Sequence, residues 1–318
     1  MTRLIVTNGD HAANALSAHF PDAEILIWRD VLIEGPVPGG ISDDELADVR
    51  AQYIEQAFGL NDVRADFTRR DQRFNEISND DEIELWFESD LHDQLQIIQF
   101  LARLAERGLT ARFKLTLAPP PLPNHIDAMA KKLSPLTPDQ IRDAATLWSA
   151  FRSANPEALF GAVKSNGTLP EARASFARLL EEFPLPFDGL GRIERSALLA
   201  IRDGAITPGL AFRHYQQTEA LPFLGDLGFY YRLDVLQACA APLLDGLPEG
   251  GIARAASTNM SVEYTHAPIE LTDIGNAVLE GRRDFIALNS IDRWIGGVHL
   301  TADNVWRYDA ERRVLAKD

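Results

Sequence analysis

The sequence predicts an α/β protein whose N-terminal part is an open, mostly parallel, Rossmann-like sheet. Two observations lead to this class. Short apolar runs alternate with segments of helical periodicity between residues 3 and 118. Loops rich in Gly, Pro and Asp separate them, as at residues 34–40, so each apolar run is short enough for a strand. Strands that alternate with helices favour parallel βαβ units.

Each element of this N-terminal part has its own signal. The expected strands are residues 3–7, 23–28, 81–87 and 111–118. The expected helices follow them at residues 11–20, 42–58 and 91–108. Ser42 with Glu45 three residues later has the spacing of a capping box, which fixes the start of the second helix. The run PPPLP at residues 119–123 then ends the alternation.

The remainder of the chain predicts two further sections. Residues 137–180 are helical in pattern, with Thr137 as a cap and Pro138 at the first helical position. After a linker at residues 181–191 come three short helical segments and an expected hairpin within residues 269–281, which is the order of a winged helix. We therefore predict an α/β domain over residues 1–123, a helical section over residues 124–182 and a winged-helix-like domain over residues 183–318.

Charge and composition exclude several classes of protein. The formal net charge of −16 disfavours general binding to nucleic acid or to an anionic membrane. Cys239 is the one cysteine, which predicts a reducing compartment, and we expect a cytoplasmic protein without a signal peptide. Apolar runs all stay below the roughly 18 residues that cross a bilayer. The third helical segment of the C-terminal section has Arg232 as its only basic residue, so we expect it to contact protein rather than nucleic acid.

Polar side chains follow each of the first three expected strands. Because the carboxyl ends of parallel strands meet at one edge of a sheet, these side chains are expected to share one crevice. They are Asn8, Gly9, Asp10 and His11 after the first strand, Arg29, Asp30 and Glu34 after the second, and Glu88, Asp90, His92 and Asp93 after the third.

Each of these residues alone also fits a structural role. Ser89 or Asp90 suits a helix N-cap, and Asp93 suits the first turn of a helix. As a set these residues predict more than structural roles, because carboxylates that crowd one crevice repel one another. Several should therefore have raised pKa values, or share a cation, an arginine or a ligand.

The residue types indicate the chemistry expected at this crevice. We predict catalytic roles for Glu88, Asp90 and Asp93, and ligand binding by Asn8, Gly9, Asp10, Arg29, Asp30, Glu34 and Arg70. Carboxylates and imidazole without thiols suit Mg²⁺, Mn²⁺ or Zn²⁺, with Asp10 and Asp90 as candidate ligands. Because no HExxH or other spaced metal motif is present, proton transfer by Glu88, Asp90 or His92 is an equal alternative. A dinucleotide fingerprint and a P-loop are both missing from the sequence.

Several segments in order give the chain a family resemblance. They are TNGDHAANAL, WRDVLIEGPVPGG, RRD, LWFESDLHDQLQ, EALPFLGD and ALNSIDRWIGGVHL. With them the chain resembles, over nearly its whole length, the bacterial proteins grouped as domain-of-unknown-function family 1835. Ser89 and His92 depart from the E-H-D-L-Y-D-Q pattern of many members. The resemblance implies a fold neighbourhood and no particular reaction.

Two functions are compatible with these features. The first is an enzyme that performs a hydrolytic or phosphoryl-transfer reaction on a small phosphate- or carboxylate-bearing ligand, held by Arg29 or Arg70. The second is a ligand-sensing regulatory protein whose C-terminal section contacts a protein partner. Trp294 beside Gly296 and Gly297 fits a core anchor at a turn, or a segment that folds back with Asn289, Asp292 and Arg293 to close the crevice.

Overall fold

The computed structural model describes residues 3–109, 112–258 and 261–318. Its main sheet has the strand order β2-β1-β3-β4-β5. The strands are β1 (Arg3–Thr7), β2 (Glu24–Ile27), β3 (Glu82–Glu88), β4 (Arg112–Ala118) and β5 (Ser134–Pro135). The first four are parallel, and the short β5 joins β4 antiparallel. The predicted, mostly parallel N-terminal sheet is therefore confirmed, although the expected start of its fourth strand at residue 111 lies outside the described residues.

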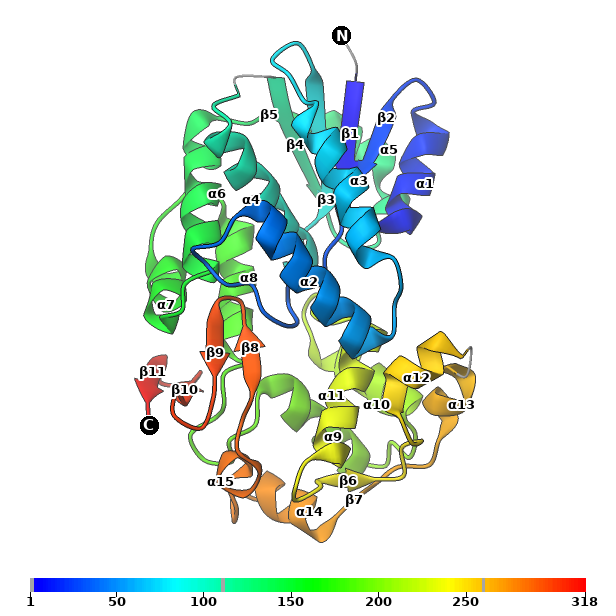
Figure 1. Cartoon of the computed structure of the whole chain (residues 1–318), viewed down its shortest axis with the longest axis vertical. Coiled ribbons are helices and arrows are strands. Elements are labelled where there is room, and N and C mark those ends of the chain that lie inside the picture. Colours follow the sequence, from blue (N-terminus) through cyan, green and yellow to red (C-terminus); the bar gives the residue numbers. More distant parts are fainter. Residues whose placement is uncertain (1–2, 110–111, 259–260) are drawn as a thin grey trace.

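Both faces of the sheet are covered, which explains why β1 and β3 are continuous apolar runs. On one face, Ile5 and Trp86 pack against α1 (Gly9–His19) and α5 (Ile126–Lys132). On the other, Leu4 and Leu85 belong to the large core that includes α4 (Leu91–Glu106). The helix after β1 and the helix after β3 thus lie on opposite faces, and the chain diverges at the carboxyl ends of these two strands (Figure 1). Ligands of open α/β sheets usually bind at such a point.

Two helices lie between β2 and β3. The capping box of Ser42 and Glu45 begins α2 (Asp43–Phe58), as predicted. The second helix, α3 (Val63–Asn75), was not predicted. Its buried face contains Val63, Phe67 and Phe74 together with Arg70, so one of the four inward positions reads as polar in the sequence.

The middle of the chain is helical, as predicted. It forms α6 (Pro138–Phe151), α7 (Pro156–Lys164) and α8 (Pro170–Leu180), and Thr137 caps the first of them in a capping box with Gln140. Both α6 and α8 pack against α4. These helices therefore form a second layer over one face of the sheet (Figure 1).

The C-terminal section is mainly helical. Its helices are α9 (Arg192–Arg202), α10 (Pro208–Thr218), α11 (Asp226–Ala238), α12 (Gly251–Ser257), α13 (Ser261–His266), α14 (Asp273–Leu279) and α15 (Phe285–Asn289). Its strands form three antiparallel pairs: β6 (Leu244–Asp245) with β7 (Glu270–Leu271), β8 (Arg293–Ile295) with β9 (Val298–Leu300), and β10 (Trp306–Asp309) with β11 (Val314–Lys317).

The winged-helix prediction is not confirmed. The strand pair that follows the three helices is only two residues long on each side, and α12 and α13 lie between β6 and β7. The expected hairpin within residues 269–281 is instead a short strand followed by α14. Thr272 caps that helix by accepting a hydrogen bond from the N–H of Gly275. A strong N-cap at Thr272 therefore starts a helix where an extended wing was expected.

The β8–β9 hairpin connects three parts of the chain. The N–H of Gly297 donates to the carbonyl oxygen of Phe151 at the end of α6, and Gly296 accepts from the N–H of Val37 in the loop after β2. A Cβ at Gly296, which has a φ of +56°, would lie 2.3 Å from the Phe151 oxygen. Only glycine permits this approach. Trp294, half-buried, stacks on His299 with ring centroids 4.3 Å apart.

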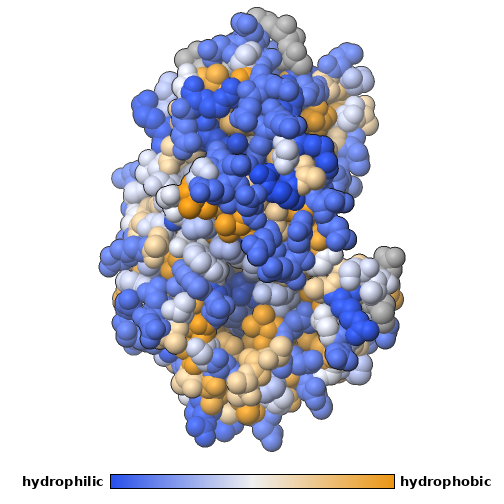
Figure 2. Space-filling model, viewed as in Figure 1, coloured by the Kyte–Doolittle hydropathy of each residue, from blue (hydrophilic) through white to orange (hydrophobic). Residues whose placement is uncertain are grey.

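The surface differs between the two ends of the molecule. Figure 2 shows a largely hydrophilic α/β part and more hydrophobic residues around a hollow in the lower, C-terminal part. Among the residues that the structure describes, no helix is both long and apolar enough for a membrane crossing.

Candidate functional site

Four of the predicted site residues contact one another where β1 and β3 end. The side-chain amide of Asn8 donates to Asp93 Oδ1 over 2.7 Å, and the backbone N–H of Glu88 donates to Asp93 Oδ2. Asp93 itself belongs to the first turn of α4. One carboxylate thus ties the end of β1, the end of β3 and the start of α4 together. We call Asn8, Glu88, Asp90 and Asp93 the strand-end cluster.

The other two carboxyl groups of the cluster also contact backbone. Asp90 is the N-cap of α4, and its Oδ1 accepts from the N–H of Asp93 over 3.0 Å. This is the structural role that the sequence offered as an alternative. Glu88 is half-buried, and its Oε1 accepts from the N–H of Leu122 in the 3₁₀ turn η1 (Leu122–Asn124).

No described cation forms an ion pair with these three carboxyl groups, so they retain protons more readily than usual. Burial raises the pKa of both Glu88 and Asp90, and the interaction between the two carboxyl groups raises the pKa of Glu88 further. Burial, with the nearby charge of Asp90, raises the pKa of Asp93 well above its usual value. Because the same interaction acts against the rise of the Asp90 pKa, Glu88 is the member of the pair that more readily retains a proton.

His92 follows the cluster on the first turn of α4. Burial lowers the pKa of its imidazole to about 4, although the charge of Asp30 partly opposes this. The ring is half-buried and forms no hydrogen bond to any described residue. With a pKa of about 4 the imidazole is neutral at neutral pH and is a weak base.

The N-terminus of α1 lies at the same end of the sheet. Its N-cap is Asn8, which makes no capping hydrogen bond because its side chain is directed to Asp93. Gly9 follows with a φ of +73°, and the space where its Cβ would lie is open to 4 Å. The first N–H groups of α1 therefore lack a side-chain cap, which is the arrangement that binds anions at helix N-termini.

The remaining predicted residues form no hydrogen bond to the strand-end cluster. Asp10 and Arg29 form an exposed bidentate pair of 2.7 and 3.1 Å. Asp30 is buried and pairs with Arg50 of α2 over 2.8 Å. The guanidinium of Arg70 pairs with Asp71 and lies over the ring of Trp28 at 4.5 Å.

Glu34 pairs with a residue far away in the sequence. Its carboxylate binds the guanidinium of Arg232 in α11 bidentately at 2.9 and 2.7 Å. Asp30, Arg70 and Glu34 thus fix the loop after β2 and form no hydrogen bond to the strand-end cluster. Sequence reasoning missed Arg50, which holds this loop through Asp30 and the carbonyl oxygens of Val31 and Glu34. The available signal was its position on the apolar stripe of α2.

The predicted metal ligands do not form a metal site. Within residues 3–109, 112–258 and 261–318, no group of three or more His, Cys, Asp or Glu side chains is arranged to hold a metal ion. Asp10 is paired with Arg29, and Asp90 caps α4. The donor set therefore does not fit Mg²⁺ or Mn²⁺.

These features define a class: an α/β protein with a polar, proton-holding site where the chain diverges between β1 and β3. Comparison with known proteins adds nothing to this class, since no protein-family model and no curated protein matches the chain. The resemblance to family 1835 stays a prediction.

Proposed function

We propose that this protein is an enzyme that acts on a small anionic molecule at the carboxyl ends of β1 and β3, in a hydrolytic or phosphoryl-transfer reaction. One observation carries the proposal. The carboxyl groups of Glu88 and Asp90 have raised pKa values at the end of β3, and the imidazole of His92, which has a lowered pKa, follows them in the first turn of α4. A proton donor and a proton acceptor at one site are what general acid–base catalysis needs.

The anionic group of the substrate binds at the start of α1 in this proposal. The uncapped N–H groups there and the open space beside Gly9 support it. Arg29 is the nearest basic residue along the loop after β2, and its pair with Asp10 is solvent-exposed. Exposed pairs contribute about 0–1 kcal/mol, so a substrate anion can replace Asp10 as the partner of Arg29.

The chemical roles then follow from the protonation states. His92 accepts the proton of the attacking water or hydroxyl, and the Glu88 carboxyl gives its proton to the leaving oxygen. Asp90 and Asp93, for which the sequence suggested catalysis, are positioning residues, because each holds backbone N–H groups. Asn8 fixes Asp93.

The test uses p-nitrophenyl phosphate and p-nitrophenyl acetate as probes of hydrolysis, and inorganic phosphate as a probe of binding. Phosphate should raise the melting temperature of the wild-type protein, and His92→Asn and Glu88→Gln should each lower turnover by about 10²–10⁴-fold. Asp22→Asn, at an exposed position, is the matched control. Absence of both turnover and stabilisation in the wild type would contradict the proposal, as would full activity in both variants.

A second candidate, a ligand-sensing protein, is favoured by the buried pair of Glu34 and Arg232, which connects the α/β part to the C-terminal helices. Ligand-induced stabilisation without turnover of any probe would select it. A protein partner of the C-terminal section is then part of the proposal, and nucleic acid is not. The helix α11 is largely buried, and its one basic residue, Arg232, is already paired. A cytoplasmic location is supported by the single cysteine.

A further inference from the structure

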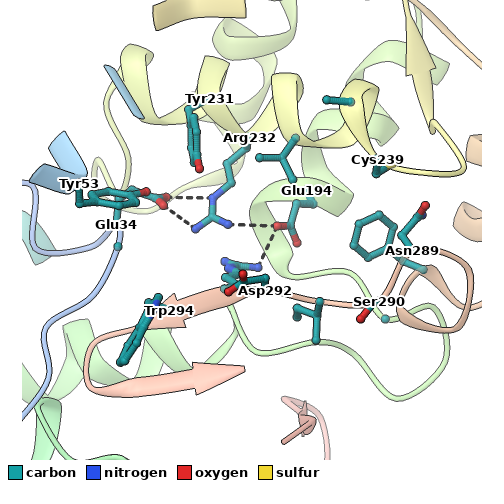
Figure 3. Close-up of a pocket in the computed structure, with 17 residues that line it drawn as sticks. Glu34, Tyr53, Glu194, Tyr231, Arg232, Cys239, Asn289, Ser290, Asp292 and Trp294 are labelled. Atoms are coloured by element: carbon teal, nitrogen blue, oxygen red, sulfur yellow. Dashed lines mark hydrogen bonds and ion pairs between the residues drawn. The ribbon is translucent and has the colours of Figure 1, made fainter. Parts of the chain in front are cut away.

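A cavity of about 530 Å³ lies between the α/β part and the C-terminal helices (Figure 3). The loop after β2 contributes Glu34 to it, α11 contributes Tyr231 and Arg232, and β8 contributes Arg293 and Trp294. Sites for small organic molecules usually have such volumes and commonly lie where two parts of a protein meet. The cavity shares none of the residues of the strand-end cluster.

One wall of the cavity is formed by buried charges. The side chain of Arg232 is 5% exposed, and its Nε and Nη2 donate hydrogen bonds to the carboxylate of Glu34. Its Nη1 lies 3.4 Å from Glu194 Oε1, and Nη1 of Arg293 binds the same oxygen at 2.8 Å. Two guanidinium groups thus converge on one carboxylate oxygen, where their positive charges repel each other (Figure 3).

These guanidinium groups have donors to spare. Nη2 of Arg293 binds Glu182 Oε2 at 3.2 Å, but its Nε is buried and has no hydrogen-bond partner among the described residues, and the side chain as a whole is 10% exposed. The 3.4 Å contact of Arg232 is long for a charge-assisted hydrogen bond. Buried donors are normally satisfied, so this wall is suited to additional acceptor oxygens that carry negative charge.

The other walls are flat and aromatic. The rings of Tyr53 and Tyr231 meet edge to face at 6.4 Å, and both line the cavity. The ring of His299 stacks on the ring of Trp294 with an interplanar angle of 7° and so fixes its orientation. Such surfaces suit an apolar or aromatic body.

We propose that this cavity binds a small organic acid, with its carboxylate on Arg232 and Arg293 and its apolar body between Tyr231 and Trp294. The site is independent of the proposed reaction at the strand ends. Glu34 keeps Arg232 in place, so binding also links the loop after β2 to α11.

The test compares phenylacetate with phenylacetamide, which has the same shape without the charge, by calorimetric titration of the full chain. Phenylacetate should bind at least roughly tenfold more tightly than the amide, since charged hydrogen bonds are the stronger ones. Equal binding of the two, or no binding of phenylacetate, would overturn the proposal.

Variants then locate the site. Arg293→Lys and Trp294→Leu should each weaken phenylacetate binding roughly tenfold, because lysine lacks the planar fork and leucine the flat ring. Arg142→Lys, at a side chain 71% exposed, should leave binding unchanged. Trp294→Leu leaves the ion pairs of Arg232 and Arg293 intact. If Arg293→Lys fails to fold, the binding of phenylacetate to Trp294→Leu therefore tests the location of the site.

Binding should also survive Glu88→Gln and His92→Asn, which separates this site from the strand-end cluster. Binding lost in those two variants but retained in Arg293→Lys and Trp294→Leu would refute the assignment to this cavity.

Discussion

At the scale of single residues, burial has the largest effect on the pKa values of the carboxyl groups in the strand-end cluster. Asp93 is 3% exposed, and its partners are the neutral amide of Asn8 and the backbone N–H of Glu88. These hydrogen bonds favour the charged form, yet burial outweighs them and raises the pKa. The folded protein therefore binds more protons at this position than the unfolded chain, whose carboxyl has a pKa near 3.8.

The first prediction concerns Asp93→Asn and pH. The stabilising contribution of a raised pKa is fully present below pH 3.8 and is lost as the pH rises through the pKa of the folded state. Asparagine is uncharged like the protonated acid, but its NH2 group replaces one of the two oxygens that accept hydrogen bonds, so Asp93→Asn should lower the free energy of unfolding less at about pH 8 than at about pH 4.5. Urea unfolding at about pH 4.5 and pH 8 measures it. An equal loss of stability at both pH values would show that the pKa of Asp93 is not raised in the folded protein.

The second prediction concerns His92. The pKa of its ring should be about 4, below the usual value of 6.5 for histidine, because burial disfavours the cation. The sign is opposite to that of Asp93, since a lowered histidine pKa costs stability as the pH falls from 6.5 to about 4. Ring proton shifts in NMR spectra measure the midpoint, and His92→Asn assigns the signal among the seven histidines. A midpoint near 6.5 would show that burial does not disfavour the imidazolium form at this position.

At the scale of elements, glycines with positive φ set how closely helices approach. Gly59 ends α2 with a φ of +65°, and a Cβ there would lie 2.3 Å from the carbonyl oxygen of Ala253 in α12. Gly108, just after α4, has a similar φ of +62°, but its Cβ would meet nothing within 4 Å. The two positions share a backbone conformation and differ in their surroundings.

The third prediction uses this difference. Gly108→Ala should lower the free energy of unfolding by about 1–2 kcal/mol, the cost of a left-handed conformation with a side chain. Gly59→Ala should cost clearly more, because α2 and α12 must also move apart. Chemical denaturation of both variants measures the difference. Equal losses would mean that the contact between the two helices is not tight.

At the scale of the whole molecule, buried ion pairs hold distant parts together. Glu34 and Arg232 are 198 positions apart, and their side chains are 2% and 5% exposed. A buried charge whose partner is removed is costly, whereas removal of both charges together costs far less.

The fourth prediction follows for this pair. Arg232→Met should lower the free energy of unfolding by about 3–5 kcal/mol, and addition of Glu34→Gln should restore part of the loss. Arg142→Met is the control, because its pair with Asp139 is exposed and should contribute about 0–1 kcal/mol. If the double variant is no more stable than the single one, uncompensated charge is not the cause of the loss.

The sequence by itself determined the elements whose signals are local. The strands expected at residues 3–7 and 81–87 follow from apolar runs, the start of α2 follows from the capping box at Ser42, and the start of α6 follows from Thr137 as a cap before Pro138. The divergence of the sheet between β1 and β3 then brought part of the predicted site together. These features need only neighbouring residues and the general rules of parallel sheets.

Only the tertiary structure decided which charge meets which. Arg70 lies buried over aromatic rings and so completes the inward face of α3, a helix that a pattern of apolar residues does not reveal. Glu34, expected with the strand-end carboxylates, is instead bound by Arg232. Apolar periodicity is a local property, but the partner of a charge depends on which distant segments the packed core brings within a few ångströms.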